Sequence, residues 1–146
     1  MSFAMTRAER EAFLSDLHVG MLCVNEEDRG PLAVPVWYRY EPGGEIFIVT
    51  GESSRKARAL RTGARATFAV QTEAPPYKYA TIEGPVTLGK PDFEHDIRAV
   101  AIRYLGPAGG EAYLKSTGAT GAGSVLIRIK PEHWLTVDYA KQFGQA

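Results

Sequence analysis

The chain has 146 residues, 45% of them hydrophobic and 23% charged, and its 17 Lys and Arg residues balance 17 Asp and Glu residues. This length predicts one domain over residues 1–146, while the zero net charge disfavours general attraction to nucleic acid or to an anionic membrane surface. No apolar run approaches the ~20 residues of a membrane-spanning helix, and no secretory leader pattern is present. Cys23 is the single cysteine, so no intramolecular disulfide is expected. Together these features predict a cytoplasmic protein.

An amphipathic helix is the first predicted element. In the segment TRAEREAFLSDLH, Thr6 and Glu9 have the spacing of a capping box, in which each side chain bonds the other residue's backbone N–H. Phe13, Leu14 and Leu17 then fall on one helical face. A helix that buries this face is therefore expected directly after Thr6.

The next segments predict an antiparallel β-hairpin, after a short apolar strand at residues 19–25. The runs LAVPVWYRY (32–40) and IFIVT (46–50) are rich in β-forming residues and flank EPGGE, a turn sequence. Pro35 has no backbone N–H to give to a ladder, so we expect it at a sheet edge or at an irregularity of its strand. Either position would leave backbone groups free for a ligand.

Basic side chains are concentrated in the segment SSRKARALRTGARATF, directly behind the strand at residues 46–50. Ser53 or Ser54 can cap a helix that runs to about Leu60 or Arg61. Gly63 lies just past this helix, where a left-handed conformation is needed. The basic segment is therefore predicted to be a short helix that begins beside a strand end.

Two interpretations of the basic segment are open from the residues alone. At the helix start, unpaired N–H groups, a partial positive charge and the side chains of Ser54, Arg55 and Lys56 suit a phosphate group. Alternatively, the segment is a solvated helix whose Arg58 and Arg61 face water and bind nothing.

The rest of the chain predicts a mainly β domain. Residues 64–72 and 77–89 form two further strands, and Asp92 caps a second helix that GPAGG interrupts, leaving a short helical piece around residues 111–114. The segment STGATGAGS is expected to be a flexible loop, and SVLIRIKPEHWLTVDYA to give one or two closing strands. About six antiparallel strands with few helices between them favour a sheet closed as a barrel.

The segment IVTGESSRKARALRTGARATFAV, preceded by PVWYRYEPGGEIF and followed by YKYATIEGPVTL, resembles the pyridoxamine 5′-phosphate oxidase-like flavin-binding split β-barrels. It is most similar to the branch that binds flavin mononucleotide (FMN) or the deazaflavin coenzyme F420. The resemblance covers most of residues 10–90 and implies an FMN-binding-protein-like split barrel of antiparallel strands. It further implies a homodimer with the cofactor between its subunits, and an oxidoreductase that transfers a hydride to a small planar organic substrate.

The resemblance also implies which residues contact the cofactor. The phosphate would lie at the start of the basic helix, the ring along the first hairpin strand, and two other strand ends would complete the site. The implied residues are Ser54, Arg55 and Lys56 at the phosphate, Pro35, Val36 and Trp37 along the ring, Val49 and Thr50 at one strand end, and Tyr77, Lys78 and Tyr79 at the other. No catalytic residue is assigned, and Tyr79 or Lys78 is the best candidate for a proton donor.

The sequence departs from the family at particular positions. Val34 stands where some members have an Arg that contacts the flavin, and EHWLTVDYAKQF replaces the arginine-containing C-terminal segment of the true oxidases. Oxidation of pyridoxamine phosphate is therefore not expected. Trp134 and Tyr139 could line a pocket, close the barrel or reach the partner subunit's site.

Functional alternatives remain open at this point. A binding protein without turnover, acting as a flavin or haem-product carrier or as a redox sensor, would use the same barrel. Nucleic-acid binding by the basic segment is disfavoured, because no aromatic side chains interleave with its arginines. A metal site is not expected, since His18, His95 and His133 have no partners at ligand spacing. Between the cofactors, Arg58 and Arg61 favour F420, whose polyglutamate tail adds negative charge.

Overall fold

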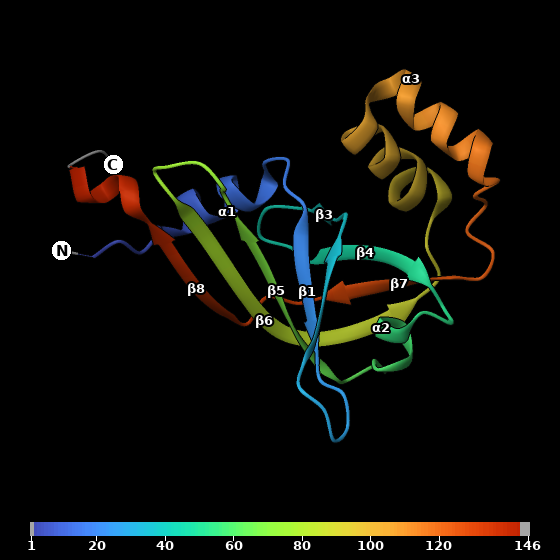
Figure 1. Ribbon diagram of the computed structural model, residues 1–146, viewed down its shortest axis with the longest axis horizontal. Coiled ribbons are helices and arrows are strands. Elements are labelled where there is room, and N and C mark those ends of the chain that lie inside the picture. The colour runs from blue at the N-terminus through green and yellow to red at the C-terminus, as the bar shows by residue number, and fades with distance from the viewer. Residues whose placement is uncertain (1, 144–146) are drawn as a thin grey trace.

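The computed structural model describes residues 2–143, in which eight strands and a small set of helices are arranged as Figure 1 shows. The strands are β1 (Gly20–Val24), β2 (Leu32–Val36), β3 (Arg39–Tyr40), β4 (Ile46–Gly51), β5 (Arg65–Gln71), β6 (Lys78–Gly89), β7 (Ser124–Ile129) and β8 (His133–Asp138). The helices are α1 (Arg7–Ser15), α2 (Arg55–Arg58), the π-helical turn η1 (Phe93–Arg98), α3 (Ala99–Thr117) and the 3₁₀ turn η2 (Tyr139–Phe143). Among the described residues, no helix combines the length and the apolar character needed to cross a bilayer.

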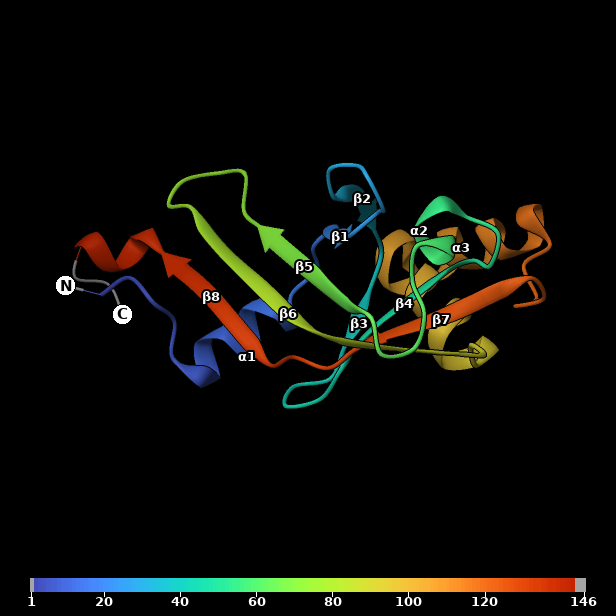
Figure 2. The same cartoon turned by 90° about the horizontal axis from the view of Figure 1, so that it is seen from below.

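The strands form one curled antiparallel sheet in the order β2-β1-β5-β6-β7-β4-β3, with β8 paired to β6. The 12-residue strand β6 belongs to both halves of the curl, because its first half pairs with β8 and its second half with β7. β5 runs along its other edge. Figure 2 shows this long strand crossing the molecule. The predicted mainly β, antiparallel split barrel is confirmed, and the closing segment gives two strands.

A sharp corner between β7 and β8 presses on Gly84 in the middle of β6. Lys130 N donates to the Pro85 carbonyl (3.1 Å), and Glu132 N donates to the Glu83 carbonyl (3.0 Å). A Cβ atom at residue 84 would lie 1.7 Å from the Lys130 carbonyl oxygen. Glycine is therefore required where the two halves of the sheet meet, because backbone atoms fill the place of any side chain.

The hydrophobic core fills the inside of the curl. Alternate strand residues point inward and are buried, as Leu22 of β1, Phe68 of β5, Ile82 of β6 and Ile127 of β7 illustrate. Leu14 of α1 is buried in the same cluster, so this helix covers one opening of the curl. The residues between them point outward, and some of these are apolar, such as the exposed Met21 and Leu135.

The amino-terminal helix confirms its predicted cap and corrects one member of its apolar face. Glu9 N donates to Thr6 Oγ1 (3.2 Å) and Thr6 N to Glu9 Oε1 (2.7 Å), the two bonds of a capping box. Lys141 Nζ also donates to Glu9 Oε1 (2.7 Å), and this bond together with the Thr6 backbone bond lowers the pKa of Glu9 to about 2. The helix ends at Ser15, so Leu17 lies beyond it and is exposed.

The run at residues 32–40 forms two short strands in place of the single strand predicted. β2 ends at Val36 and pairs with β1, whereas β3 begins at Arg39 and pairs with β4. The predicted turn between β3 and β4 is confirmed, but β3 is only 2 residues long. Pro35 lies on β2, at one end of the strand order, so its predicted position at a sheet edge is also confirmed.

Tyr38 explains the break between β2 and β3. Its ring is fully buried against Phe68, with 4.8 Å between the ring centroids, and its hydroxyl donates to the Leu14 carbonyl (2.6 Å). Its backbone N–H donates to the Tyr104 hydroxyl (3.1 Å) instead of to a neighbouring strand. The chain therefore leaves the sheet at Tyr38 in order to bury a large aromatic side chain.

α2 is a single helical turn and ends before the predicted Leu60 or Arg61. Ser54 is its cap, since the Ser54 hydroxyl accepts the Ala57 N–H (3.3 Å). Gly63 has the predicted left-handed conformation, with φ at +92°. Its N–H donates to a carbonyl of β6 (2.9 Å), which returns the chain to the sheet and shortens the helix.

The second predicted helix is confirmed with its break, but it is longer than predicted. Asp92 caps η1 by accepting the His95 N–H (2.9 Å), and η1 continues directly into α3. Gly106, within GPAGG, has φ at +80° and divides α3 into two arms. The second arm runs to Thr117, whereas the sequence predicted only a short piece around residues 111–114.

The two arms of α3 pack against each other at the end of the sheet that carries β4 and β7 (Figure 1). A Cβ atom at Gly110 would lie 2.8 Å from the Ile102 Cα atom, so the arms meet at backbone distance. This close packing keeps the folded-back helix beside β4, where it forms one wall of a cavity.

Candidate functional site

Most of the residues that the resemblance assigns to the cofactor meet where β2 and β4 end and α2 begins. They line an open depression of about 450 Å³, which we call the groove. Its lining residues are Val19, Pro35, Val36, Trp37, Val49, Thr50, Lys56 and Tyr113. Val19 and Tyr113 were not predicted, because nothing in their local sequence connects them with a strand end far along the chain.

The turn between β4 and α2 forms the polar side of the groove. Thr50 Oγ1 and Ser54 Oγ lie 3.2 Å apart and share a hydrogen bond, so Ser54 supports the groove from behind Thr50. Lys56 lines the groove and forms no ion pair with any described residue. A free ammonium group beside a hydroxyl in an otherwise apolar depression suits one anionic group.

Trp37 forms the aromatic wall of the groove. Its ring stacks on Tyr104, with 5.0 Å between centroids and 4° between planes, and it lies 5.6 Å from the Tyr113 ring. The Tyr104 hydroxyl donates to the His18 carbonyl (2.6 Å), and burial raises the pKa of this phenol. Because its stacking partner is anchored, Trp37 presents a fixed, flat surface.

Arg55 lines a different cavity, although it lies between Ser54 and Lys56 in the sequence. Its guanidinium forms a two-point ion pair with Glu26, at 2.7 and 2.5 Å, and the hydrogen bonds of this pair lower the pKa of Glu26. The cavity measures about 520 Å³, and we call it the basic cavity. Its charged lining residues are Glu26, Glu27, Arg29, Arg55, Arg58 and Arg61, and the guanidinium groups outnumber the carboxylates.

The predicted residues at the start of β6 lie outside the groove. Tyr77 is 50% exposed, and Lys78 Nζ lies 3.8 Å from an Asp138 carboxylate oxygen on β8. Tyr79 lines a cavity of about 640 Å³ on the outer face of the sheet, and Pro35 lines both this cavity and the groove. Tyr79 is therefore the member of this trio that adjoins the groove within one chain.

Trp134 and Tyr139 do not line the groove of their own chain. Trp134 packs against the core, and the guanidinium carbon of Arg10 lies 4.5 Å from the centroid of its ring. Tyr139 is 40% exposed, and its ring centroid is 5.7 Å from that of Phe3. Across residues 2–143, no group of three or more His, Cys, Asp or Glu side chains could hold a metal ion.

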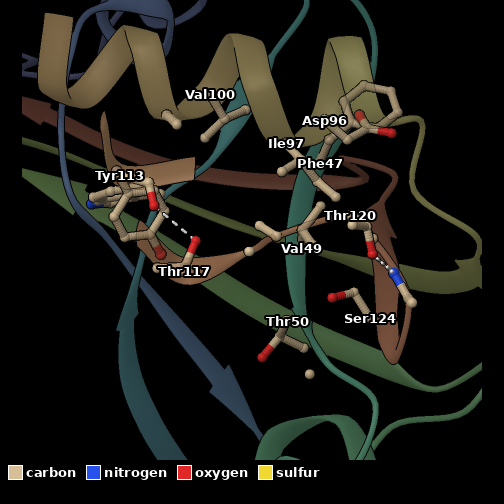
Figure 3. Close-up of a pocket in the computed structure, with 17 residues that line it drawn as sticks. Phe47, Val49, Thr50, Asp96, Ile97, Val100, Tyr113, Thr117, Thr120 and Ser124 are labelled. Carbon is tan, nitrogen blue, oxygen red and sulfur yellow. Dashed lines mark hydrogen bonds between the residues drawn. The ribbon is translucent and has the colours of Figure 1, made fainter. Parts of the chain in front are cut away.

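A second cavity beside the groove was missed by sequence reasoning. It measures about 380 Å³, lies between β4 and α3, and we call it the chamber (Figure 3). Trp37, Val49, Thr50 and Tyr113 line both the chamber and the groove. The lining residues that belong to the chamber alone include Phe47, Asp96, Ile97, Val100, Thr117 and Thr120.

Few residues of the chamber belong to a recognisable sequence pattern. Ile97 and Val100 recur at helical spacing, which predicts a face buried against the core, and Thr120 lies in a segment that reads only as a loop. The cavity arises because Gly106 folds the second arm of α3 back, which brings Tyr113 and Thr117 over the end of β4. A long-range packing event of this kind has no local sequence pattern.

The curled sheet and the groove define the class of protein, a split β-barrel with a site suited to a flat ligand that carries an anionic group. The chain belongs to the pyridoxamine 5′-phosphate oxidase family, whose sequence model matches residues 6–138. No curated protein sequence matches the chain significantly.

Three solved structures with the same fold are similar to this chain over most of their length. A conserved hypothetical protein from Mycobacterium tuberculosis is 23% identical, with 99% of this chain and 91% of that chain covered and a TM-score of 0.80. An F420 reductase is 19% identical, with coverage of 86% and 94% and a TM-score of 0.68. An FAD-binding protein from Mesorhizobium loti is 18% identical, with coverage of 91% and 94% and a TM-score of 0.63. At these identities the likeness shows the fold.

Proposed function

We propose that the chain binds a flavin-type cofactor in the groove, F420 in preference to FMN, and acts as an oxidoreductase on a small planar organic substrate. The observation that carries this proposal is the meeting of Pro35, Val36, Trp37, Val49, Thr50 and Lys56, from separate parts of the chain, in one depression. The family match and the likeness to an F420 reductase and an FAD-binding protein support it.

The groove fits such a cofactor in the chemistry of its lining. Trp37, Val36 and Val49 offer aromatic and aliphatic surface to a planar ring, while Lys56 and Thr50 offer a cation and a hydroxyl to a phosphate. Pro35 at the sheet edge adds apolar surface without a backbone donor. The residues present are therefore those that a flat, phosphate-bearing molecule requires.

The basic cavity favours F420 over FMN. α2 contributes to both depressions, because Lys56 lines the groove and the adjacent Arg55 and Arg58 line the basic cavity. FMN ends at its phosphate, whereas the deazaflavin continues into a polyglutamate tail. Arg58 and Arg61 form no ion pair with a described residue and can meet the carboxylates of that tail.

The chain's own contribution is to bind, orient and exclude water. No Asp, Glu, His or Cys side chain lines the groove, so among the described residues it holds no acid–base pair of the usual kind. When bound, a flavin or deazaflavin supplies hydride-transfer chemistry that no amino-acid side chain has. Trp37 and Val49 line both the groove and the adjoining cavity, so they would hold a bound ring beside its acceptor.

Turnover separates an oxidoreductase from a carrier or sensor on the same barrel. With reduced F420 bound, we expect 2-cyclohexen-1-one or 1,4-naphthoquinone to reoxidise the cofactor, because both are uncharged, conjugated and planar enough for this site. Pyridoxamine phosphate should give little reoxidation. The measurement is stopped-flow absorbance at the cofactor band. Fast reoxidation by pyridoxamine phosphate alone would contradict the proposed substrate class, and reoxidation by nothing in the panel would favour a carrier.

We also propose that two chains form a homodimer that completes the site. The groove continues through Pro35 onto the outer face of the sheet, where Val19, Met21 and Leu135 are 57%, 39% and 60% exposed. Exposed apolar side chains that adjoin a binding site are typical of an interface. Light scattering at micromolar concentration should give twice the mass of one chain, with at least ~1,000 Å² buried. A monomer that still binds cofactor tightly would rule out the shared site.

A further inference from the structure

The chamber is a second binding site, built from walls that are distant in sequence. β4 supplies Phe47 and Val49 on one side, and η1 and α3 supply Ile97 and Val100 on the other, as Figure 3 shows. Its volume of about 380 Å³ falls in the range of small-molecule sites. None of the phosphate-binding side chains proposed for the cofactor other than Thr50 lines it, so it is available to a different molecule.

An ion pair holds the two walls of the chamber together. Asp96 of η1, whose side chain is 4% exposed, accepts a hydrogen bond from Arg39 Nη2 of β3 (2.7 Å). The Arg39 guanidinium in turn lies 4.0 Å from the centroid of the Phe47 ring. At the loop that covers the chamber, Gly121 packs closely against Ile97, since a Cβ atom added at Gly121 would be 3.2 Å from Ile97 Cδ1. These contacts fix the shape of the chamber before any ligand binds.

The chamber offers no free charge. No Lys, Arg or His lines it within the described part of the chain, and Asp96 is its sole carboxylate there. Both oxygens of this carboxylate have donors, Oδ1 from Arg39 and Oδ2 from the Asp92 N–H (2.8 Å). An anion would meet no counter-charge and a cation no free carboxylate. Because an unpaired charge is costly to bury, the lining selects an uncharged ligand.

Two of the hydroxyl groups that line the chamber belong to exposed residues at its mouth. Thr117 Oγ1 donates to the Tyr113 carbonyl (2.8 Å), and Thr120 Oγ1 accepts the Ala122 N–H (3.3 Å). The Thr120 hydroxyl hydrogen is left to donate to a ligand oxygen. Trp37 adds aromatic surface on the side that the chamber shares with the groove. Such a lining suits a planar ring with one neutral polar substituent.

We propose that the chamber binds an uncharged, flat aromatic or conjugated compound, held between Val49 of β4 on one side and Val100 of α3 on the other. As the place of the hydride acceptor, this assignment rests on the proposed function, because the chamber and the groove share Trp37, Val49, Thr50 and Tyr113. As a binding site, it rests on the geometry and charge of the chamber alone.

The test is calorimetric titration of the full chain, without added cofactor, with 2-naphthol and with 2-naphthylmethylammonium at pH 7. The two probes share a ring system, but the first is neutral and the second is a cation, which the Lys56 side of the groove also disfavours. We expect 2-naphthol to bind at least about tenfold more tightly. Val100→Trp, which fills the chamber, should weaken 2-naphthol binding at least about tenfold. Ala99→Trp adds the same ring at the neighbouring exposed position outside the chamber and should leave the affinity unchanged.

A second variant keeps the test valid if Val100→Trp fails to fold. Thr117 is exposed at the mouth, so Thr117→Trp should fold normally and still obstruct 2-naphthol. Equal affinity for both probes, or full 2-naphthol affinity in Thr117→Trp, would overturn the assignment. Because no cofactor is present, failure of cofactor binding leaves this result intact. Conversely, binding of F420 without binding of 2-naphthol would refute the ligand proposed for the chamber but not the cofactor proposed for the groove.

Discussion

Replacing Gly84 with alanine should lower the free energy of unfolding by about 3–4 kcal/mol. The added Cβ would lie 1.7 Å from the Lys130 carbonyl oxygen and 2.8 Å from the Lys130 carbonyl carbon. Both are backbone atoms, so no side-chain rotation can relieve the overlap. The corner between β7 and β8 must move, and the hydrogen bonds of Lys130 and Glu132 to β6 are then strained or lost. Urea denaturation followed by circular dichroism measures the loss.

Gly89 is the matched control for this substitution. It lies on the same strand, and a Cβ atom there would meet nothing within 4 Å. Gly89→Ala should therefore change the free energy of unfolding by no more than about 0.5 kcal/mol. If Gly84→Ala were as stable as Gly89→Ala, the result would contradict the close contact between Gly84 and the corner that joins β7 to β8.

Replacing Lys56 with alanine should weaken cofactor binding by about 1.5–3 kcal/mol, the scale for hydrogen bonds to charged groups. This corresponds to an increase in Kd of roughly 10- to 150-fold. Lys56 is the cation of the groove and has no ion-pair partner among the described residues, so its removal costs the fold little. Fluorescence titration with F420 measures the change, and thermal melting checks the fold.

Lys90 provides a control with the same change of charge. It is exposed between β6 and η1 and lines neither the groove nor the basic cavity. Lys90→Ala should bind the cofactor as tightly as the original protein does. If the two variants bound the cofactor equally well, Lys56 would have no direct contact with the phosphate.

Local sequence patterns predicted those features that local chemistry decides. The capping box of Thr6 and Glu9, the left-handed Gly63 and the helix break at Gly106 all occur where the sequence places them. Each depends on a few neighbouring residues and on backbone conformations that only certain side chains allow. About six strands with few helices between them likewise predicted an antiparallel β fold, which the structure confirms.

Features that depend on distant packing could not be predicted in this way. The run at residues 32–40 looks like one strand, but Tyr38 is drawn into a core made by Leu14 and Phe68, which are remote in sequence. Arg55 and Lys56 look equivalent, yet Glu26 pairs with Arg55 and leaves Lys56 alone in the groove. The chamber depends on how α3 folds back, so its residues carry no motif.

Absorption and fluorescence titration of the purified full chain with F420 and with FMN shows whether the groove binds a flavin-type cofactor and which one. We expect saturable binding of F420 and weaker binding of FMN, because the arginines of the basic cavity can contact the polyglutamate tail, which FMN lacks. Tighter binding of FMN would contradict the choice of cofactor. Binding of neither molecule would contradict the groove as a flavin site altogether.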